Sequence, residues 1–182
     1  MRRLPLVFMV LIFFHACKKD DNVDPLGKQV ITTLTFSLSS SGTTEPLVLS
    51  YQDLDGNGGN DPIIDGGALQ ANSIYFGMLE LLDESITPAA NITNEIMLNE
   101  EAYQVFFTSA GLDITVIYAD LDNDGYPIGL FTAINTGEAS QGSVIVSVVR
   151  GLNKSGVGVS DGQINNAGGE IQIQGTFPIT IQ

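Results

Sequence analysis

The chain has 182 residues, a net charge of −14, and a single cysteine and a single histidine, Cys17 and His15. Beyond residue 17 there is neither a thiol nor an imidazole, which excludes Ser-His-Asp and Cys-His nucleophiles, zinc sites with His or Cys ligands, His-ligated haem and disulfides. The acidic surface repels nucleic acid, so we expect no nucleic-acid partner and no enzyme activity of these classes.

The first residues have the pattern of an export signal. Arg2 and Arg3 precede an apolar run from Leu4 to Phe14 that is too short to span a bilayer as a helix. Cys17 follows Ala16 where a signal peptidase would cut. We predict a signal peptide over 1–16, a charged tether over 17–28 and a folded domain over 29–182. The alternative is an ordinary secretory signal with an unmodified thiol.

Residues Phe14-His15-Ala16-Cys17 resemble a bacterial lipoprotein signal, which implies lipidation of Cys17 as the first residue of the mature chain. The segment after it, Lys18-Lys19-Asp20-Asp21-Asn22, is similar to the start of Bacteroidota lipoproteins, where it implies transfer to the outer leaflet of the outer membrane. A charged, solvated tether is the alternative. Loss of the signal would leave five basic and 21 acidic residues, so membrane attachment would come through lipid and not through a basic patch.

Apolar and polar residues alternate with period two along most of the chain after residue 29, which predicts half-buried antiparallel strands. The clearest runs are ITTLTFSLSS, LVLSYQD, ITVIYAD, SVIVSVV and EIQIQGTFPITIQ. Stretches rich in Gly, Asn, Asp and Pro separate them and predict turns. One short helix is expected within 88–102, capped by Asn94. The fold class predicted is all-β, an antiparallel β-sandwich of about nine strands.

Two similar segments, YQDLDG from Tyr51 and YADLDN from Tyr118, predict an internal two-fold repeat. Each follows a strand-like run and precedes a Pro-Ile pair. We predict repeats over about 30–104 and 105–182 that share one core, with two tandem immunoglobulin-like domains as the alternative.

The same segments carry the spacing of a calcium loop. Oxygen ligands at positions one, three and five, followed by Gly, match the first half of an EF-hand loop. The candidate ligands are Asp120, Asp122 and Asp124 in one segment and Asp53, Asp55 and Asn57 in the other.

Position twelve is Ile64 or Phe131 instead of a bidentate Glu, so neither segment is an EF-hand. Further ligands would come from Asp61, Asp65, Asp161 or Glu170. We predict a weak calcium site with a Kd of about 10⁻⁴ to 10⁻³ M. The alternative is that these residues form Asx turns without metal.

Taken together, the Cys17 signal, Cys-Lys-Lys-Asp-Asp-Asn and the two Tyr-x-Asp-Leu-Asp units resemble a family of small Bacteroidota lipoproteins labelled type 1 periplasmic binding fold superfamily protein. That label implies an α/β fold, which the strand alternation contradicts. The resemblance implies a lipid-anchored binding module of the cell envelope, at the outer membrane and accessory to a TonB-dependent receptor.

Two other functions stay open. One is a calcium-stabilised structural or adhesive surface domain without a small-molecule ligand. The other is a hydrolase using Glu80, Asp83 and Glu84 as paired carboxylates, which the lack of a convergent catalytic set disfavours.

Overall fold

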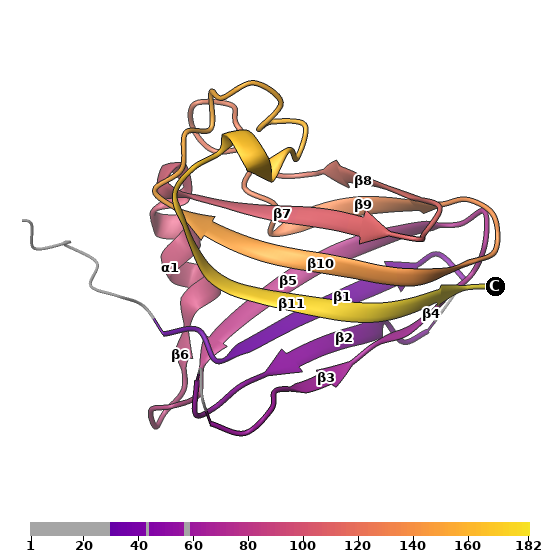
Figure 1. Ribbon diagram of the computed structural model, residues 1–182, viewed down its shortest axis with the longest axis horizontal. Coiled ribbons are helices and arrows are strands. Elements are labelled where there is room, and N and C mark those ends of the chain that lie inside the picture. The colour runs from indigo at the N-terminus through magenta and orange to yellow at the C-terminus, as the bar shows by residue number, and fades with distance from the viewer. Residues whose placement is uncertain (1–29, 43, 57–58) are drawn as a thin grey trace, which may run out of the picture.

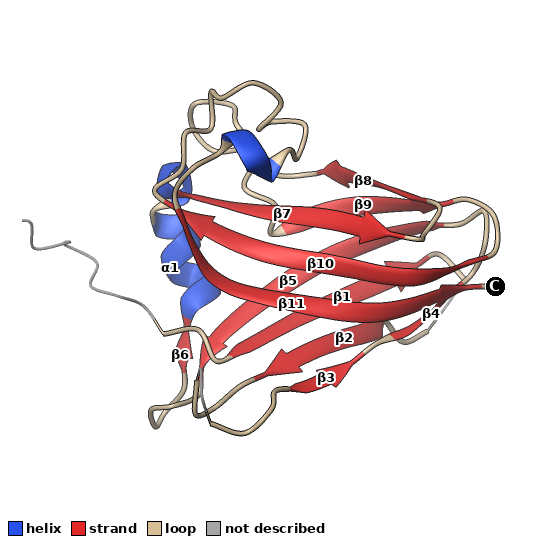
Figure 2. Ribbon diagram, in the orientation of Figure 1, coloured by secondary structure: helices blue, strands red, loops and turns tan. Residues whose placement is uncertain are grey.

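Strands make up about half of the residues that the computed structural model describes, which are 30–42, 44–56 and 59–182. They form two sheets that pack face to face, mainly antiparallel, with one short helix at one end (Figures 1 and 2). The prediction of an all-β sandwich is confirmed. The signal peptide, Cys17, the tether and Asn57 lie outside the described residues.

Sheet A contains seven strands, in the order β3-β2-β1-β5-β9-β8, with β6 paired to β5. Their bounds are β1 (Thr33–Ser40), β2 (Leu47–Gln52), β3 (Ile63–Asp65), β5 (Ile74–Asp83), β6 (Ala90–Asn91), β8 (Ile114–Tyr118) and β9 (Phe131–Thr136).

Sheet B contains four strands, in the order β4-β11-β10-β7. Their bounds are β4 (Gly67–Leu69), β7 (Tyr103–Ala110), β10 (Ser140–Arg150) and β11 (Glu170–Ile181). All pairings are antiparallel except that of β4 with β11. The described residues form eleven strands, more than the roughly nine expected, because β3, β4 and β6 have three residues or fewer and are too short for alternation to reveal.

The core lies between the sheets and joins both halves of the sequence. Leu34 and Phe36 from β1 belong to the same buried cluster as Val146 from β10 and Phe177 from β11. Alternate residues of each strand supply this cluster because successive side chains point to opposite faces of a sheet. A single shared core corresponds to one sandwich and not to two tandem domains.

The helix α1 (Ile92–Leu98) covers one end of the sandwich, and the short 3₁₀ turn η1 (Glu100–Ala102) leads from it into β7. Ile92 and Ile96 are its buried residues. The helix was expected, but its predicted cap was wrong. Asn91 is the N-cap, and its side chain accepts a hydrogen bond from the backbone N–H of Asn94, which is already inside the first turn.

The two halves of the sequence are arranged differently around their Asp-Leu-Asp segments. In the first half, β2 pairs with the preceding strand β1 within sheet A. In the second half, β8 lies in sheet A, whereas the preceding strand β7 lies in sheet B. The similarity of the segments therefore does not extend to the pairing of the strands before them.

Candidate functional site

The second acidic segment, Asp120–Gly125, lies in the connection between β8 and β9, and its first carboxylate binds backbone donors. Asp120 Oδ1 accepts a hydrogen bond from Gly129 N at 2.8 Å. Asp120 Oδ2 accepts bonds from Leu130 N at 2.8 Å and Phe131 N at 3.1 Å. Both oxygens are thus turned toward the start of β9. This contrasts with a calcium loop, in which they would face the centre of the turn.

The second carboxylate of this segment is buried and paired with Lys154. Asp122 Oδ2 lies 2.8 Å from the Lys154 ammonium nitrogen, and the two side chains are 1% and 5% exposed, respectively. Asp122 Oδ1 accepts hydrogen bonds from the N–H groups of Asp124 and Tyr126. The carboxylate therefore has a cation and two backbone donors, which compensates for its removal from water.

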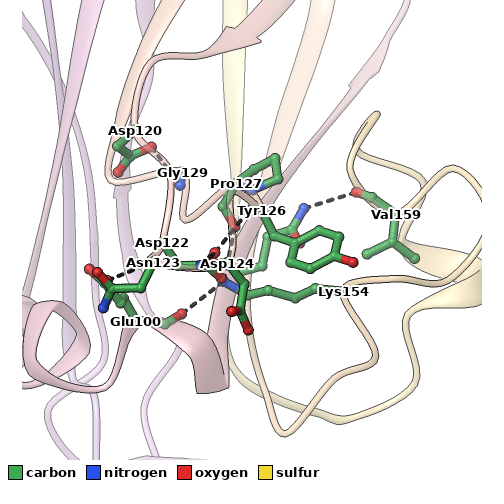
Figure 3. Close-up of polar contacts among 11 residues, drawn as sticks. Glu100, Asp120, Asp122, Asn123, Asp124, Tyr126, Pro127, Gly129, Lys154 and Val159 are labelled. Atoms are coloured by element: carbon green, nitrogen blue, oxygen red, sulfur yellow. Dashed lines mark hydrogen bonds and ion pairs between the residues drawn. The ribbon is translucent and has the colours of Figure 1, made fainter.

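The Lys154 ammonium binds three oxygens at once (Figure 3). It donates to Asp122 Oδ2 and to Glu100 O, each at 2.8 Å, and to Pro127 O at 3.1 Å. An ammonium group has three N–H donors and no acceptor, so all three are used here. Lys154 thus connects the acidic loop to the turn before β7, and it binds one of the three carboxylates that the calcium hypothesis assigns to the metal.

The electrostatics of Asp122 follow from this pairing. Burial alone would raise the pKa of its carboxyl group. The hydrogen bond from Lys154, the bonds from Tyr126 N and Asp124 N and the lysine charge outweigh burial and lower the pKa below its ordinary value of 3.8. Asp122 is therefore an anion at neutral pH, and calcium at this loop would compete with Lys154 for it.

The same connection covers the open edge between the two sheets. Val105 on the edge strand β7 donates its N–H to Ile128 O and accepts the Tyr118 hydroxyl at 2.8 Å. Burial, together with the charge of Asp120, raises the pKa of Tyr118 to about 12, although a hydrogen bond with Gln104 opposes this shift. The backbone groups of Val105, at the edge of sheet B, are thus bonded inside the protein, which leaves them unavailable for pairing with other chains.

The first acidic segment has a more open arrangement. Asp53 Oδ1 accepts a bond from Gly56 N at 2.8 Å, and Asp55 Oδ2 accepts bonds from the backbone and side chain of Asn60. These bonds with Asn60 lower the pKa of the exposed Asp55 carboxyl group. The backbone contacts lie within the loop, from N–H groups three and five residues after the carboxylates, and no described cation lies against either carboxylate.

A polar groove of about 690 Å³ runs beside this segment. Its lining includes Asp53 and Asp55 and, from the start of β11, Glu170 to Gln174. Of the four proposed supplementary ligands, only Glu170 shares this groove with the segment. Within the described part of the chain, no three acidic, histidine or cysteine side chains are placed to hold a metal ion together.

The remaining acidic candidates are dispersed. Asp65 accepts a bond from the Ser50 hydroxyl at 2.9 Å, and Asp61 and Asp161 are exposed. Glu84 accepts hydrogen bonds from the side chains of Thr33 and Gln52, which lower its pKa. Of the three acids considered for hydrolysis, Asp83 and Glu84 therefore have protein partners, and Glu80 is exposed.

The two acidic segments leave sheet A toward the same end, the end where β5 finishes, but on opposite sides of β5. Gln52, the last residue of β2, pairs with Thr33, which also pairs with Leu82 near the end of β5. Tyr118, the last residue of β8, pairs with Thr132 near the start of β9. The strands β2 and β8 are separated by four inter-strand steps. Four steps amount to about 19 Å. The two segments therefore cannot share one metal ion.

Sequence reasoning missed an exposed apolar surface on the outer face of sheet A, which we call the apolar face. It consists of Ile74, Phe76 and Met78 on β5, Phe131 and Ala133 on β9, and Ile117 on β8. The three β5 side chains are 58%, 66% and 51% exposed, in chain order.

The apolar face is continuous because its members are neighbours in the strand register. Met78 pairs with Phe131, and Ala133 pairs with Phe76 on one side and with Ile117 on the other. Paired side chains on one face lie about 4.5–5.5 Å apart, within van der Waals reach of large side chains. Large contiguous apolar patches are uncommon on monomeric proteins and mark contact surfaces.

Comparison of the chain with protein-family models, with curated proteins and with solved structures finds no match. Among residues 30–42, 44–56 and 59–182, no helix has the length and apolar character needed to cross a bilayer.

Proposed function

We propose that the protein is a lipid-anchored binding module of the cell envelope that presents the apolar face of sheet A to a partner. The observation that carries the proposal is the row Ile74, Phe76 and Met78, each more than half exposed at the centre of a seven-stranded sheet. Complete burial of a fully exposed side chain of this kind is worth roughly 1.5–3 kcal/mol, and a partner can recover the share that these half-exposed side chains still leave in water.

The other sheet supports this reading by contrast. On the outer face of sheet B, Phe106 and Val149 are covered by the segment between β10 and β11, through Val159 and Ala167. The rest of that face has Thr108, Thr176 and Gln174, with the partly buried Ile145 between the two threonines. Ile171, 50% exposed, lies apart from Ile145 on this face, so exposed apolar residues are scattered on sheet B and contiguous on sheet A.

The envelope location rests on the sequence. The signal-like residues 1–16 and Cys17 motivate the lipid anchor, and the resemblance to Bacteroidota lipoproteins motivates the outer membrane and an uptake receptor as partner. The net charge of −14 disfavours attachment through a basic patch to anionic headgroups, which supports attachment through lipid.

Two measurements test the proposal on the full-length protein in its own cells. Wild type should partition with outer membranes, and Cys17→Ser should move it to the soluble fraction. In mild detergent, wild type should migrate as a larger native complex, which Phe76→Thr/Met78→Thr should dissociate. Threonine keeps the strand propensity at these positions.

A control double variant removes exposed apolar side chains elsewhere. Val157→Thr/Ile171→Thr replaces residues that are 84% and 50% exposed outside the apolar face, and should leave the complex intact. A complex that survives Phe76→Thr/Met78→Thr, or that both double variants weaken equally, would refute the apolar face as the binding surface.

A further inference from the structure

We infer that the partner bound by the apolar face is a protein with an apolar centre and a basic rim. This inference rests on the proposed function and names the chemistry of the partner at the same site. It follows from three features of sheet A: the composition of the face, the groups around it and the distribution of charge.

The composition is that of a protein-binding surface. Two phenylalanines and a methionine lie together, and no member of the apolar face is charged. The centres of protein interfaces are enriched in aromatic residues and Met and depleted of charged residues. The composition of the apolar face therefore matches the centre of a protein–protein interface.

Uncharged hydrogen-bonding groups border the apolar face. Ser37 and Ser39 on β1 pair with Met78 and Phe76, respectively, and Asn135 on β9 pairs with Ile74. Such groups can form the polar rim that surrounds the apolar centre of an interface.

The charge near the face is acidic. Glu80 follows Met78 on the same face of β5 and is exposed. The two basic residues of the described part lie elsewhere: Lys154 is buried against Asp122, and Arg150 stacks over the Tyr103 ring at 5.8 Å. A partner with basic residues opposite Glu80 would be attracted, and a second copy of this acidic chain would be repelled.

The first experiment identifies the occupant of the face. A photo-crosslinking amino acid replaces Phe76 in the full-length protein in its own cells, and a matched variant carries it at Thr176, which is exposed on the outer side of β11. Adducts are identified by mass spectrometry. We expect one protein adduct that is specific to position 76.

The second experiment measures binding between the identified protein and the purified full-length chain. Phe76→Thr should weaken the affinity at least about tenfold, as expected for an aromatic side chain at the centre of an interface. Its melting temperature should match wild type because the side chain is exposed.

Charge reversal then tests the basic rim. Glu80→Lys should lower the association rate constant about fivefold more than Glu170→Lys, an equal change of net charge at the exposed start of β11. Binding by wild type should also weaken as salt is raised, since salt screens the attraction.

Each outcome separates the inference from the proposed function. Adducts to a second copy of this chain, or to lipid, overturn the inference. If a protein adduct forms but Glu80→Lys and Glu170→Lys lower the association rate constant equally, the partner has no basic rim opposite Glu80, and the proposed binding function is unaffected. No adduct at position 76 beyond that at position 176 overturns both.

Discussion

Removing the ammonium group of Lys154 should destabilise the protein strongly. Lys154→Met keeps most of the side-chain volume but removes the charge and three hydrogen-bond donors. It leaves Asp122, whose side chain is 1% exposed, as a buried carboxylate without its cation. It also removes the donor to Glu100 O and Pro127 O, which lie 2.8 and 3.1 Å from the ammonium.

The magnitude follows from the burial of the pair. Breaking a buried ion pair by removing one partner costs about 3–5 kcal/mol, whereas an exposed pair contributes about 0–1 kcal/mol. We therefore expect Lys154→Met to lower the free energy of unfolding by about 3–5 kcal/mol. For a domain of this size the melting temperature should fall by roughly 6–20 °C.

Urea unfolding followed by circular dichroism measures this loss, with Lys154→Met, Asp122→Asn and the double variant forming a mutant cycle. The double variant removes both charges and should cost at least about 1 kcal/mol less than the sum of the single variants. Asp124→Asn, an exposed acid on the same loop, is the control and should change stability by less than about 0.5 kcal/mol. A loss below about 1 kcal/mol for Lys154→Met would refute the reasoning.

Three further predictions concern the acidic loops. Folding lowers the pKa of Asp122, so the stabilisation that its carboxylate provides is complete above the ordinary pKa of 3.8 and is lost as the pH falls below that value. The difference in unfolding free energy between wild type and Asp122→Asn, measured by urea unfolding, should therefore shrink on acidification. A difference that stays constant with pH would contradict this. Gly129→Ala should lower the melting temperature more than Gly125→Ala. Both glycines have φ above +80°, which costs about 1–2 kcal/mol for alanine, but only at Gly129 would the new Cβ also lie 2.9 Å from Val105 O. Equal losses in the two variants would contradict this. With the predicted Kd of about 10⁻³ to 10⁻⁴ M, calcium at about 10 mM should stabilise wild type by about 1.4–2.7 kcal/mol and raise its melting temperature. Asp53→Asn/Asp55→Asn should abolish this rise. No rise in wild type would refute the calcium site.

The strands were the most predictable part of the fold because alternation is a local signal of burial on one face. Leu34, Phe36 and Leu38 on β1 all point into the core, as their spacing indicates. The short strands β3 and β4 escaped prediction because three residues cannot establish a period. They exist because the neighbouring strands β2 and β11 offer edges to pair with.

The apolar face had a signal in the sequence that alternation obscured. From Ile74 to Leu79 the chain is apolar throughout apart from Gly77, which is typical of a strand buried on both faces. The inner residues Tyr75 and Leu79 are indeed buried, but the outer ones are exposed because no described element covers that side of β5. An uninterrupted apolar run in an antiparallel sheet is thus a sign of a contact surface.

The Lys154 pair could not be predicted from sequence because its members are 32 residues apart and come from different loops. Nothing in the local pattern around Asn153-Lys154-Ser155 indicates a buried cation. The local sequence determines the acidic turn, since Asp122 accepts bonds from N–H groups two and four residues later. The tertiary fold determines which cation that turn receives.

The two acidic segments differ in whether a lysine already binds them, so calcium should affect the stability of the two loops differently. A tethered ammonium stabilises the second loop at any calcium concentration, because it is part of the chain and already binds three oxygens. The first segment has no described cation against its carboxylates, so only there can calcium add stability without displacing a lysine. Any calcium stabilisation should therefore persist in Asp122→Asn and disappear in Asp53→Asn/Asp55→Asn. The opposite pattern would mean that calcium displaces Lys154 from Asp122, and the loop would then be a metal site after all.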